Sequence, residues 1–215
     1  MLKIENAETF GWEAAIRGMR NPKNSWSKSD SRWSFPCENG MDEPRFIVGE
    51  SDLKLASALA NSGADDGKFL RMIHVQLDVT APLYWHKEAD QYKVGTVTDS
   101  CSTMHKIHAK EFTLDDFSHE HLYSPLHDLK PTVDLLNVYR ERFLETKDKE
   151  DWWQLIQLLP SSYNQRRTWD LNYAVLRNIY HARKGHRLDE WKTLLDWIET
   201  LPYAKELICS VGKNT

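Results

Sequence analysis

Apolar and polar residues alternate clearly between Phe69 and Val79. Successive side chains of a β-strand point to opposite faces of a sheet, so this alternation predicts a strand that is buried on one face only. Ala81-Pro82 follows directly and is expected to end the strand. The apolar positions of the pattern are Ile73, Val75, Leu77 and Val79.

Helical spacing of apolar residues describes much of the remaining chain. A short helix is predicted to begin at Ser51-Asp52, which supply an N-cap and an acidic first turn, and to stop at Gly63. No second alternation of comparable clarity follows the strand. Four helices are expected instead, and Pro or Gly residues separate them at 133–147, 151–159, 168–183 and 188–201. A strand early and helices late predict an α+β fold, with an antiparallel or mixed sheet core and a C-terminal helical layer.

The length and composition favour one domain over residues 1–215. A chain of 215 residues with 40% hydrophobic residues can bury a single core. The segment 21–44 is rich in Ser, Asn, Pro and Gly but contains Trp26, Trp33 and Phe35, so it is predicted to be an ordered loop whose aromatic rings pack. Residues 205–215 are expected to form a flexible tail.

Charge and cysteine content narrow the class of function. The formal charge of −4 provides no basic field to drive binding to nucleic acid. The three cysteines are too few and too widely spaced for a disulfide framework or a metal clamp, so a reducing cytoplasm is the expected location. The start of the chain lacks an apolar signal segment, and no stretch approaches the ~20 apolar residues that span a bilayer, so no membrane partner is expected.

Two stretches concentrate residues that can perform chemistry. The first, 84–106, follows the predicted strand and mixes charged, hydroxyl and aromatic side chains, among them Lys87, Tyr92, Lys93 and Ser100. Binding sites are often built on a loop that a rigid element supports. The alternative for this stretch is a polar helix and loop on the surface.

The second stretch, 159–191, contains Arg166 and Arg167 and a predicted helix with Asn172 and Arg183 at the border of its apolar face. An amide and a guanidinium can hydrogen-bond in the plane of a heterocyclic ligand. The alternative is an ordinary amphipathic helix that Thr168 or Asp170 caps.

The order of these features resembles the flavin-dependent thymidylate synthases. That family has a signature of the form RHRxxxxNExSxRY after a strand, and later a motif that runs Leu-Pro, Asn-x-Arg-Ser-Leu, Leu-Arg and Ala-Gln-x-Glu. Aligning the second motif on Leu159-Pro160 matches Asn172, Leu176 and Arg183 without a gap, and its glutamate reaches Glu190 with one deletion. The signature matches only at Ser100. The sequence of residues 87–96, Lys-Glu-x-Asp-x-Tyr-Lys-Val-Gly-Thr, also resembles that of a divergent branch of the family from phages and low-GC bacteria.

The resemblance implies a homotetramer that binds FAD between subunits. It implies transfer of a one-carbon group from methylenetetrahydrofolate to C5 of dUMP, or a related pyrimidine modification, with NADPH as co-substrate. Arg183 and Ser100 would be the catalytic and nucleotide-contacting residues and are expected to meet in one pocket, where Arg183 can stabilise negative charge that develops on a pyrimidine carbonyl. Asn172 and Tyr92 would contact the flavin. The residues expected to neutralise a phosphate are Lys87, Lys93, Arg166 and Arg167.

Two alternative functions remain open. Asp90, Gln91 and Tyr92 stand where the family has Arg-His-Arg, and Ser102 replaces the arginine after the serine, so the chain can also be read as a catalytically silent nucleotide-binding relative. A histidine-rich stretch at 105–128 leaves a metal-dependent phosphohydrolase as the second alternative. No metal site is predicted, because the stretch lacks a His pair at i, i+4 with a catalytic Glu on one helix.

Overall fold

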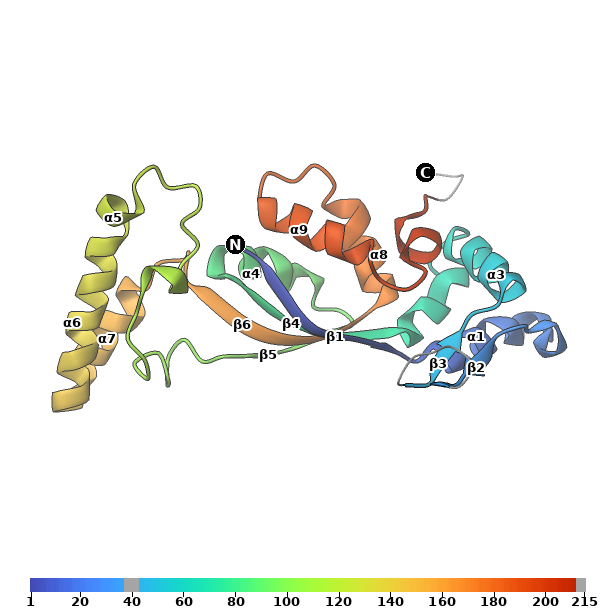
Figure 1. Cartoon of the computed structure of the whole chain (residues 1–215), viewed down its shortest axis with the longest axis horizontal. Helices are drawn as coiled ribbons and strands as arrows, with labels where there is room; N and C mark the ends of the chain where they lie inside the picture. Colours follow the sequence, from blue (N-terminus) through green and yellow to red (C-terminus); the bar gives the residue numbers. More distant parts are fainter. Residues whose placement is uncertain (37–42, 212–215) are drawn as a thin grey trace.

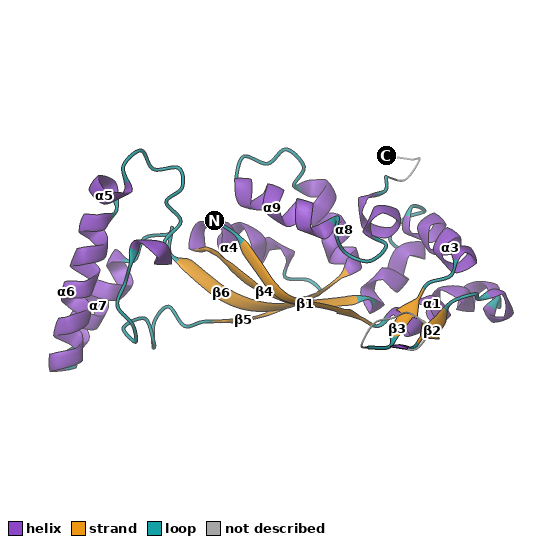
Figure 2. Ribbon diagram, in the orientation of Figure 1, coloured by secondary structure: helices purple, strands orange, loops and turns teal. Residues whose placement is uncertain are grey.

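The computed structural model describes residues 1–36 and 43–211, and it has an α+β fold built on a four-stranded antiparallel sheet (Figures 1 and 2). The strand order is β1-β4-β6-β5. The strands are β1 (Lys3–Phe10), β4 (His74–Pro82), β5 (Thr96–Ser100) and β6 (Asn164–Asn172). The predicted fold class, a sheet core with a helical layer, is therefore confirmed.

The helices α4, α8 and α9 lie on one face of this sheet (Figure 2). The alternation in β4 agrees with this arrangement, because Val75, Leu77 and Val79 are buried whereas Gln76 is exposed. The helices are α1 (Trp12–Arg20), α3 (Glu50–Ala60), α4 (Leu83–Ala89), α5 (Pro125–Asp128), α6 (Lys130–Thr146), α7 (Lys149–Leu158), α8 (Tyr173–Ala182) and α9 (Asp189–Ile198). A second, two-stranded sheet pairs β2 (Arg32–Ser34) with β3 (Arg45–Ile47).

The predicted strand exists, but it begins later than the sequence pattern indicated. Residues Asp66–Met72 form a 3-10 helix, η3, and the strand starts at His74. Phe69 and Leu70 are adjacent and both buried, which a helical turn allows and a strand with one buried face does not. The helices expected at 133–147, 151–159 and 188–201 are confirmed as α6, α7 and α9.

The helix predicted at 168–183 is wrong in its first part. Residues up to Asn172 belong to β6, which pairs with β4 from His74↔Asn172 to Pro82↔Asn164. Helix α8 starts at Tyr173, and its N-cap is Asn172, whose Oδ1 accepts a hydrogen bond from the Val175 backbone N–H at 3.1 Å. Neither Thr168 nor Asp170 caps it, because both are strand residues.

Apolar side chains form two clusters. The larger one fills the space between the sheet and the helices on its covered face. The smaller one holds the pair α6 and α7, which projects from one end of the sheet (Figure 1), against the loop that follows β5. Its buried members are Ile107, Phe112, Phe117, Leu129, Val133, Leu136 and Leu155. Within the described ranges, no helix is long and apolar enough to cross a membrane.

The segments 205–215 and 21–44 were both expected to lack regular secondary structure. Residues Lys205–Cys209 form a π-helical turn in which Leu207 and Ile208 are fully buried, so the expectation of a flexible tail is corrected for this part of the chain. In the segment 21–44, Trp33 packs edge-on against Phe46 with ring centroids 5.6 Å apart. Residues 37–42 of that segment, with Cys37, and residues 212–215 lie outside the described ranges.

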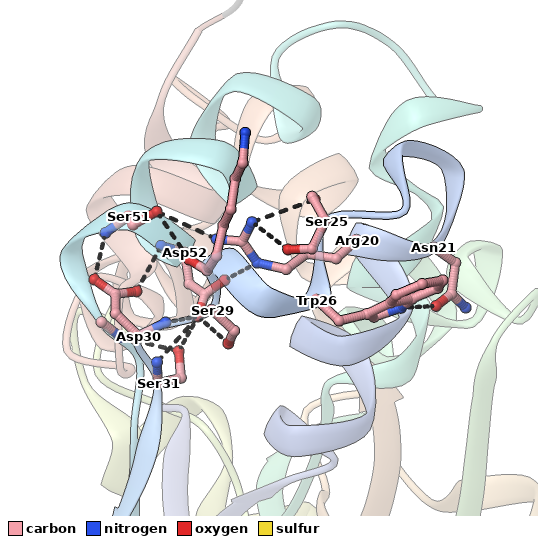
Figure 3. A network of polar contacts seen from close by, with 11 residues as sticks. Arg20, Asn21, Ser25, Trp26, Ser29, Asp30, Ser31, Ser51 and Asp52 are labelled. Atoms are coloured by element: carbon pink, nitrogen blue, oxygen red, sulfur yellow. Dashed lines mark hydrogen bonds and ion pairs between the residues drawn. The ribbon is translucent and has the colours of Figure 1, made fainter.

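A buried ion pair fixes helix α3 against α1 (Figure 3). The Asp52 carboxylate is fully buried and accepts a hydrogen bond from Arg20 Nε at 2.5 Å, and others from the hydroxyls of Ser29 (2.7 Å) and Ser31 (2.6 Å). Burial alone would raise the pKa of Asp52, but these hydrogen bonds and the Arg20 charge outweigh it and lower the pKa. Asp30 accepts hydrogen bonds from the backbone N–H groups of Ser51 and Asp52 and so caps the same helix.

Replacing Asp52 with Ala should lower the free energy of unfolding by about 3–5 kcal/mol, because Arg20 would stay charged and buried without its partner. Urea denaturation followed by circular dichroism measures this. The control is Glu50→Ala, which removes an exposed carboxylate from the same helix and should change stability by no more than about 0.5 kcal/mol. A similar, small change in both variants would contradict the anchoring role of Asp52.

Candidate functional site

Arg183 lies at the C-terminal end of α8, where its side chain is held on three sides. Its guanidinium lies over the Trp191 ring, 4.5 Å from the centroid. Nε donates to the Tyr92 hydroxyl at 2.8 Å, and Nη1 donates to Glu88 Oε2 at 3.1 Å. The side chain is 11% exposed. The guanidinium is thus fixed in one orientation next to solvent.

The residues that hold Arg183 come from the segment after β4. Glu88 is on α4, and Tyr92 ends the following 3-10 turn, Asp90–Tyr92 (η4). Trp85 and His86 of α4 are fully buried, and Trp85 stacks on Trp169 of β6 with ring centroids 5.6 Å apart. Burial lowers the pKa of His86 to about 4, so its ring is neutral near pH 7 and Nε2 can donate to the Gln165 carbonyl oxygen. This packing fixes α4 on the sheet.

Arg167 and Ser100 are strand partners on β6 and β5, and Arg167 also contacts the η4 turn. Ser100 is exposed at the end of β5 and pairs with Arg167 of β6. The Arg167 guanidinium donates to Asp90 Oδ1 at 2.7 Å and to Gln165 Oε1 at 2.9 Å. Among the described residues, no hydrogen bond joins Ser100 to Arg183, and their presence in one pocket stays a prediction.

Of the other cations expected to bind a phosphate, Lys87 and Lys93 are exposed on α4 and after η4. Arg166 pairs with Asp78 at 2.6 Å. Hydrogen bonds from Thr168, Asn6 and Arg166 lower the pKa of Asp78 well below its usual value. Because adjacent strand residues face opposite sides of a sheet, Arg166 points away from the side that Arg167 occupies.

Asn172 uses its side-chain amide to bind the backbone of this chain. Besides capping α8, its Nδ2 donates to the Gly95 carbonyl oxygen at 3.4 Å. Gly95 has φ +84°, a conformation that favours glycine, and it leads the chain into β5. Asn172 is also nearly buried, so it ties two elements together at the end of β6. Glu190, which aligns with the family glutamate, is buried and accepts a hydrogen bond from the Tyr84 hydroxyl at 2.5 Å.

A cavity of about 1060 Å³ opens between α3, η3 and α8. Small side chains form much of its wall, and α8 contributes Ala174, Arg177, Asn178 and His181. Arg71 of η3 also lines it, is exposed, and makes no hydrogen bond or ion pair within the described part of the chain. The small lining residues are Ser57, Ala58, Ala60, Ser62, Gly63, Ala64 and Gly67.

Arg177 and His181, which α8 contributes to this cavity, are already partnered. Arg177 donates to Asn61 Oδ1 at 2.8 Å and to the Leu207 carbonyl oxygen at 2.9 Å. His181 Nε2 lies 2.9 Å from the Ile208 carbonyl oxygen. Burial lowers the pKa of both side chains. Arg177 and His181 therefore hold the segment around Leu207 and Ile208 against α8. Arg71 has no such partner among the described residues and is the lining cation able to meet an anionic ligand.

The cavity was not predicted from the sequence. Ala174, Arg177, Asn178 and His181 recur at spacings of three and four, so they share one face of α8 and this face could have been recognised. Neither Asn172 nor Tyr92 lines the cavity. In the described ranges, no group of three or more His, Cys, Asp or Glu side chains is arranged to hold a metal ion.

Comparisons with known proteins point to one fold. No family model and no curated protein matches the sequence. Among solved structures, thymidylate synthase X (ThyX) from Helicobacter pylori with FAD and dUMP is similar over 97% of both chains, with a TM-score of 0.67 and 15% identity. A second structure of that enzyme with FAD and dUMP has a TM-score of 0.68 and 14% identity, and it covers 98% of this chain and 100% of its own.

The UMP/dUMP methylase PolB from Streptomyces cacaoi, bound with 5-Br dUMP, is also similar, with a TM-score of 0.62 and 12% identity over 99% of this chain and 95% of its own. Both proteins match over nearly the whole chain, so the likeness includes the sheet and the helices that carry the site. The resemblance read from the sequence is thereby confirmed at the level of the fold: the chain has the fold of the flavin-dependent thymidylate synthase ThyX and of the methylase PolB.

Proposed function

We propose that this chain binds FAD and a uridine nucleotide and methylates C5 of the uracil ring, converting dUMP to dTMP or making a related pyrimidine. The proposal includes methylenetetrahydrofolate as one-carbon donor, NADPH as co-substrate, a homotetramer as the active assembly and a cytoplasmic location. The observation that carries it is the likeness, over nearly the full chain, to enzymes whose structures hold FAD with dUMP or a dUMP analogue.

The cavity between α3, η3 and α8 fits a flavin dinucleotide. Its volume of about 1060 Å³ is slightly above the roughly 300–1,000 Å³ typical of small-molecule sites, as a large ligand requires. Its small lining residues leave room for a planar ring, Asn178 offers an amide, and Arg71 offers an unpaired cation to a diphosphate. We therefore place the flavin here rather than at Asn172 and Tyr92, whose polar groups serve the chain itself.

Arg183 is the residue that we propose for the uracil ring. FAD, when bound, supplies the redox chemistry of the reaction. The chain has to stabilise negative charge on a uracil carbonyl oxygen while C5 acts as nucleophile, and a preoriented guanidinium does this at low reorganisation cost. Tyr92, Glu88 and Trp191 provide that orientation before any ligand binds. No protein nucleophile is needed.

The nucleotide phosphate can be neutralised near Ser100. Arg167 lies beside Ser100 in the sheet, and Lys87 and Lys93 are exposed in the same stretch. Arg166 is a poor candidate, because it faces the opposite side of β6 and pairs with Asp78. A nucleotide that reaches from Arg183 to Ser100 would connect the two predicted catalytic residues.

Replacing Arg183 with Ala should weaken dUMP and UMP binding by ~1.5–3 kcal/mol, because one charged hydrogen bond to the base is lost. Arg183→Lys should not restore it, since a Lys cannot reproduce the planar fork. Calorimetric titration measures both. Arg187→Ala removes an equal, exposed charge nearby and should bind like the wild type. Equal affinity of the wild type and both Arg183 variants would contradict the base-binding role.

Replacing Arg71 with Ala should weaken FAD binding about 10- to 100-fold, as expected for the loss of a charged hydrogen bond to a phosphate. Quenching of flavin fluorescence during titration measures it. Lys68→Ala is the matched control, because it removes the same charge from an exposed position of η3 that does not line the cavity. Equal weakening in the two variants would show that Arg71 makes no specific contact. Absence of FAD binding to the wild type would remove the flavin from the proposal.

A further inference from the structure

The carboxylate of Glu88 offers one oxygen that the chain itself does not use. Oε2 accepts hydrogen bonds both from Arg183 Nη1 at 3.1 Å and from Gln91 Nε2 at 3.3 Å. Oε1 accepts none from the described residues. The side chain is 40% exposed, so the carboxylate is partly open to solvent. Glu88 Oε1 is thus an unused acceptor on the same carboxylate whose Oε2 binds the Arg183 guanidinium.

We propose that Glu88 and Arg183 together recognise the imide edge of uracil, and that Glu88 makes the site select uracil over cytosine. This inference rests on the proposed function, and it names the residue that selects the base. Arg183 donates to a ring carbonyl oxygen, and Glu88 Oε1 accepts the adjacent N3–H.

Uracil and cytosine differ in the hydrogen-bonding group at N3, and this difference allows the site to select uracil. Uracil has an N3–H donor between two carbonyl acceptors, so it complements a guanidinium donor next to a carboxylate acceptor. Cytosine has an acceptor at N3, which would face the carboxylate lone pairs. A site built to hydrogen-bond one group rejects an analogue that leaves its polar groups unpaired.

The pair is rigid enough to act as a template. Trp85 and Ala89, on either side of Glu88 along the helix, are buried, which fixes how α4 sits on the sheet. The first turn of α4 is tied to the loop before β6, since the backbone N–H of Leu83 donates to the Tyr163 carbonyl oxygen at 3.0 Å. Trp191 supports the guanidinium from below at 4.5 Å. Preorganised groups of this kind make base selection effective.

The same imide edge exists in the pyrimidine ring of a flavin. The chemistry that Glu88 and Arg183 recognise is therefore a cyclic imide, which either uracil or the flavin can supply. We commit to uracil, because the cavity that fits the flavin is lined by Arg71, Asn178 and other residues that do not include Glu88 or Arg183.

The test compares the affinities of dUMP, dCMP and N3-methyl-dUMP for the wild type, Glu88→Gln and Glu88→Ala by calorimetry. The wild type should prefer dUMP to both analogues. Glu88→Gln should lower the dUMP-to-dCMP ratio by about 10-fold or more, because its amide can either donate or accept and a charged hydrogen bond is lost. Glu88→Ala should bind dUMP and N3-methyl-dUMP about equally. Asp99→Asn removes an exposed carboxylate from β5 and should leave all ratios unchanged.

The results of these titrations distinguish a failure of the Glu88 inference from a failure of the proposed function. Equal weakening of dUMP and dCMP in the Glu88 variants, with the ratio kept, would show that Glu88 only positions Arg183 and would overturn the inference. Loss of FAD affinity in Glu88→Gln with an unchanged nucleotide ratio would assign the imide contact to the flavin and would overturn it as well. If the wild type binds neither dUMP nor UMP, the proposed function fails, and the inference fails with it.

Discussion

The structure depends on the antiparallel pairing of β4 with β6 along nine residue pairs. Each strand leads directly into a helix, and because the strands are antiparallel, α4 and α8 start at opposite ends of the sheet and run toward each other over the same face. A nine-residue strand is ~30 Å long, whereas helices of seven and ten residues are ~10 and ~15 Å long. The two helix ends therefore meet over the middle of the sheet, where Arg183 reaches Glu88.

The same geometry explains how the chain differs from the family pattern at residues 90–92. Asp90 pairs with Arg167, and Tyr92 accepts a hydrogen bond from Arg183. The residues that replace Arg-His-Arg thus hold two cations that other elements supply. We propose that the positive charge of the nucleotide site comes from Arg167 of β6 and Arg183 at the end of α8, and not from the signature segment. FAD would bind in the cavity that Arg71 lines.

The spacing of apolar residues within a segment predicted those helices and strands that bury one regular face. The alternation in β4 and the helical spacing of α6, α7 and α9 were sufficient, because each of these elements buries one regular face. Strand β6 was missed, since Gln165 and Arg167 make half of its covered face polar, so that no clear alternation marks it and its identity depends on pairing with a distant strand. Strands β1 and β5 lie at the sheet edges, and the described side chains of β5 are mostly exposed, so no buried face marks it.

The candidate site was predictable only in part, for the same reason. Arg183 stood out at the border of a helical face, but its partners Glu88 and Trp191 come from other elements and could not be deduced from spacing. The cavity was missed because three segments form it. That Ser100 and Arg183 share a pocket stays a prediction; in the structure Arg183 contacts Tyr92 of η4, and Arg167, the strand partner of Ser100, contacts Asp90 of the same turn.

The most direct test of the account is the reaction itself. The purified protein, incubated with FAD, NADPH, methylenetetrahydrofolate and dUMP or UMP, should yield a nucleotide that is one methyl group heavier by mass spectrometry, with the new methyl group on C5. Product should be absent when FAD or the folate is omitted. Binding of FAD and nucleotide without any product would contradict the proposed methylation and would identify the chain as a silent nucleotide-binding relative.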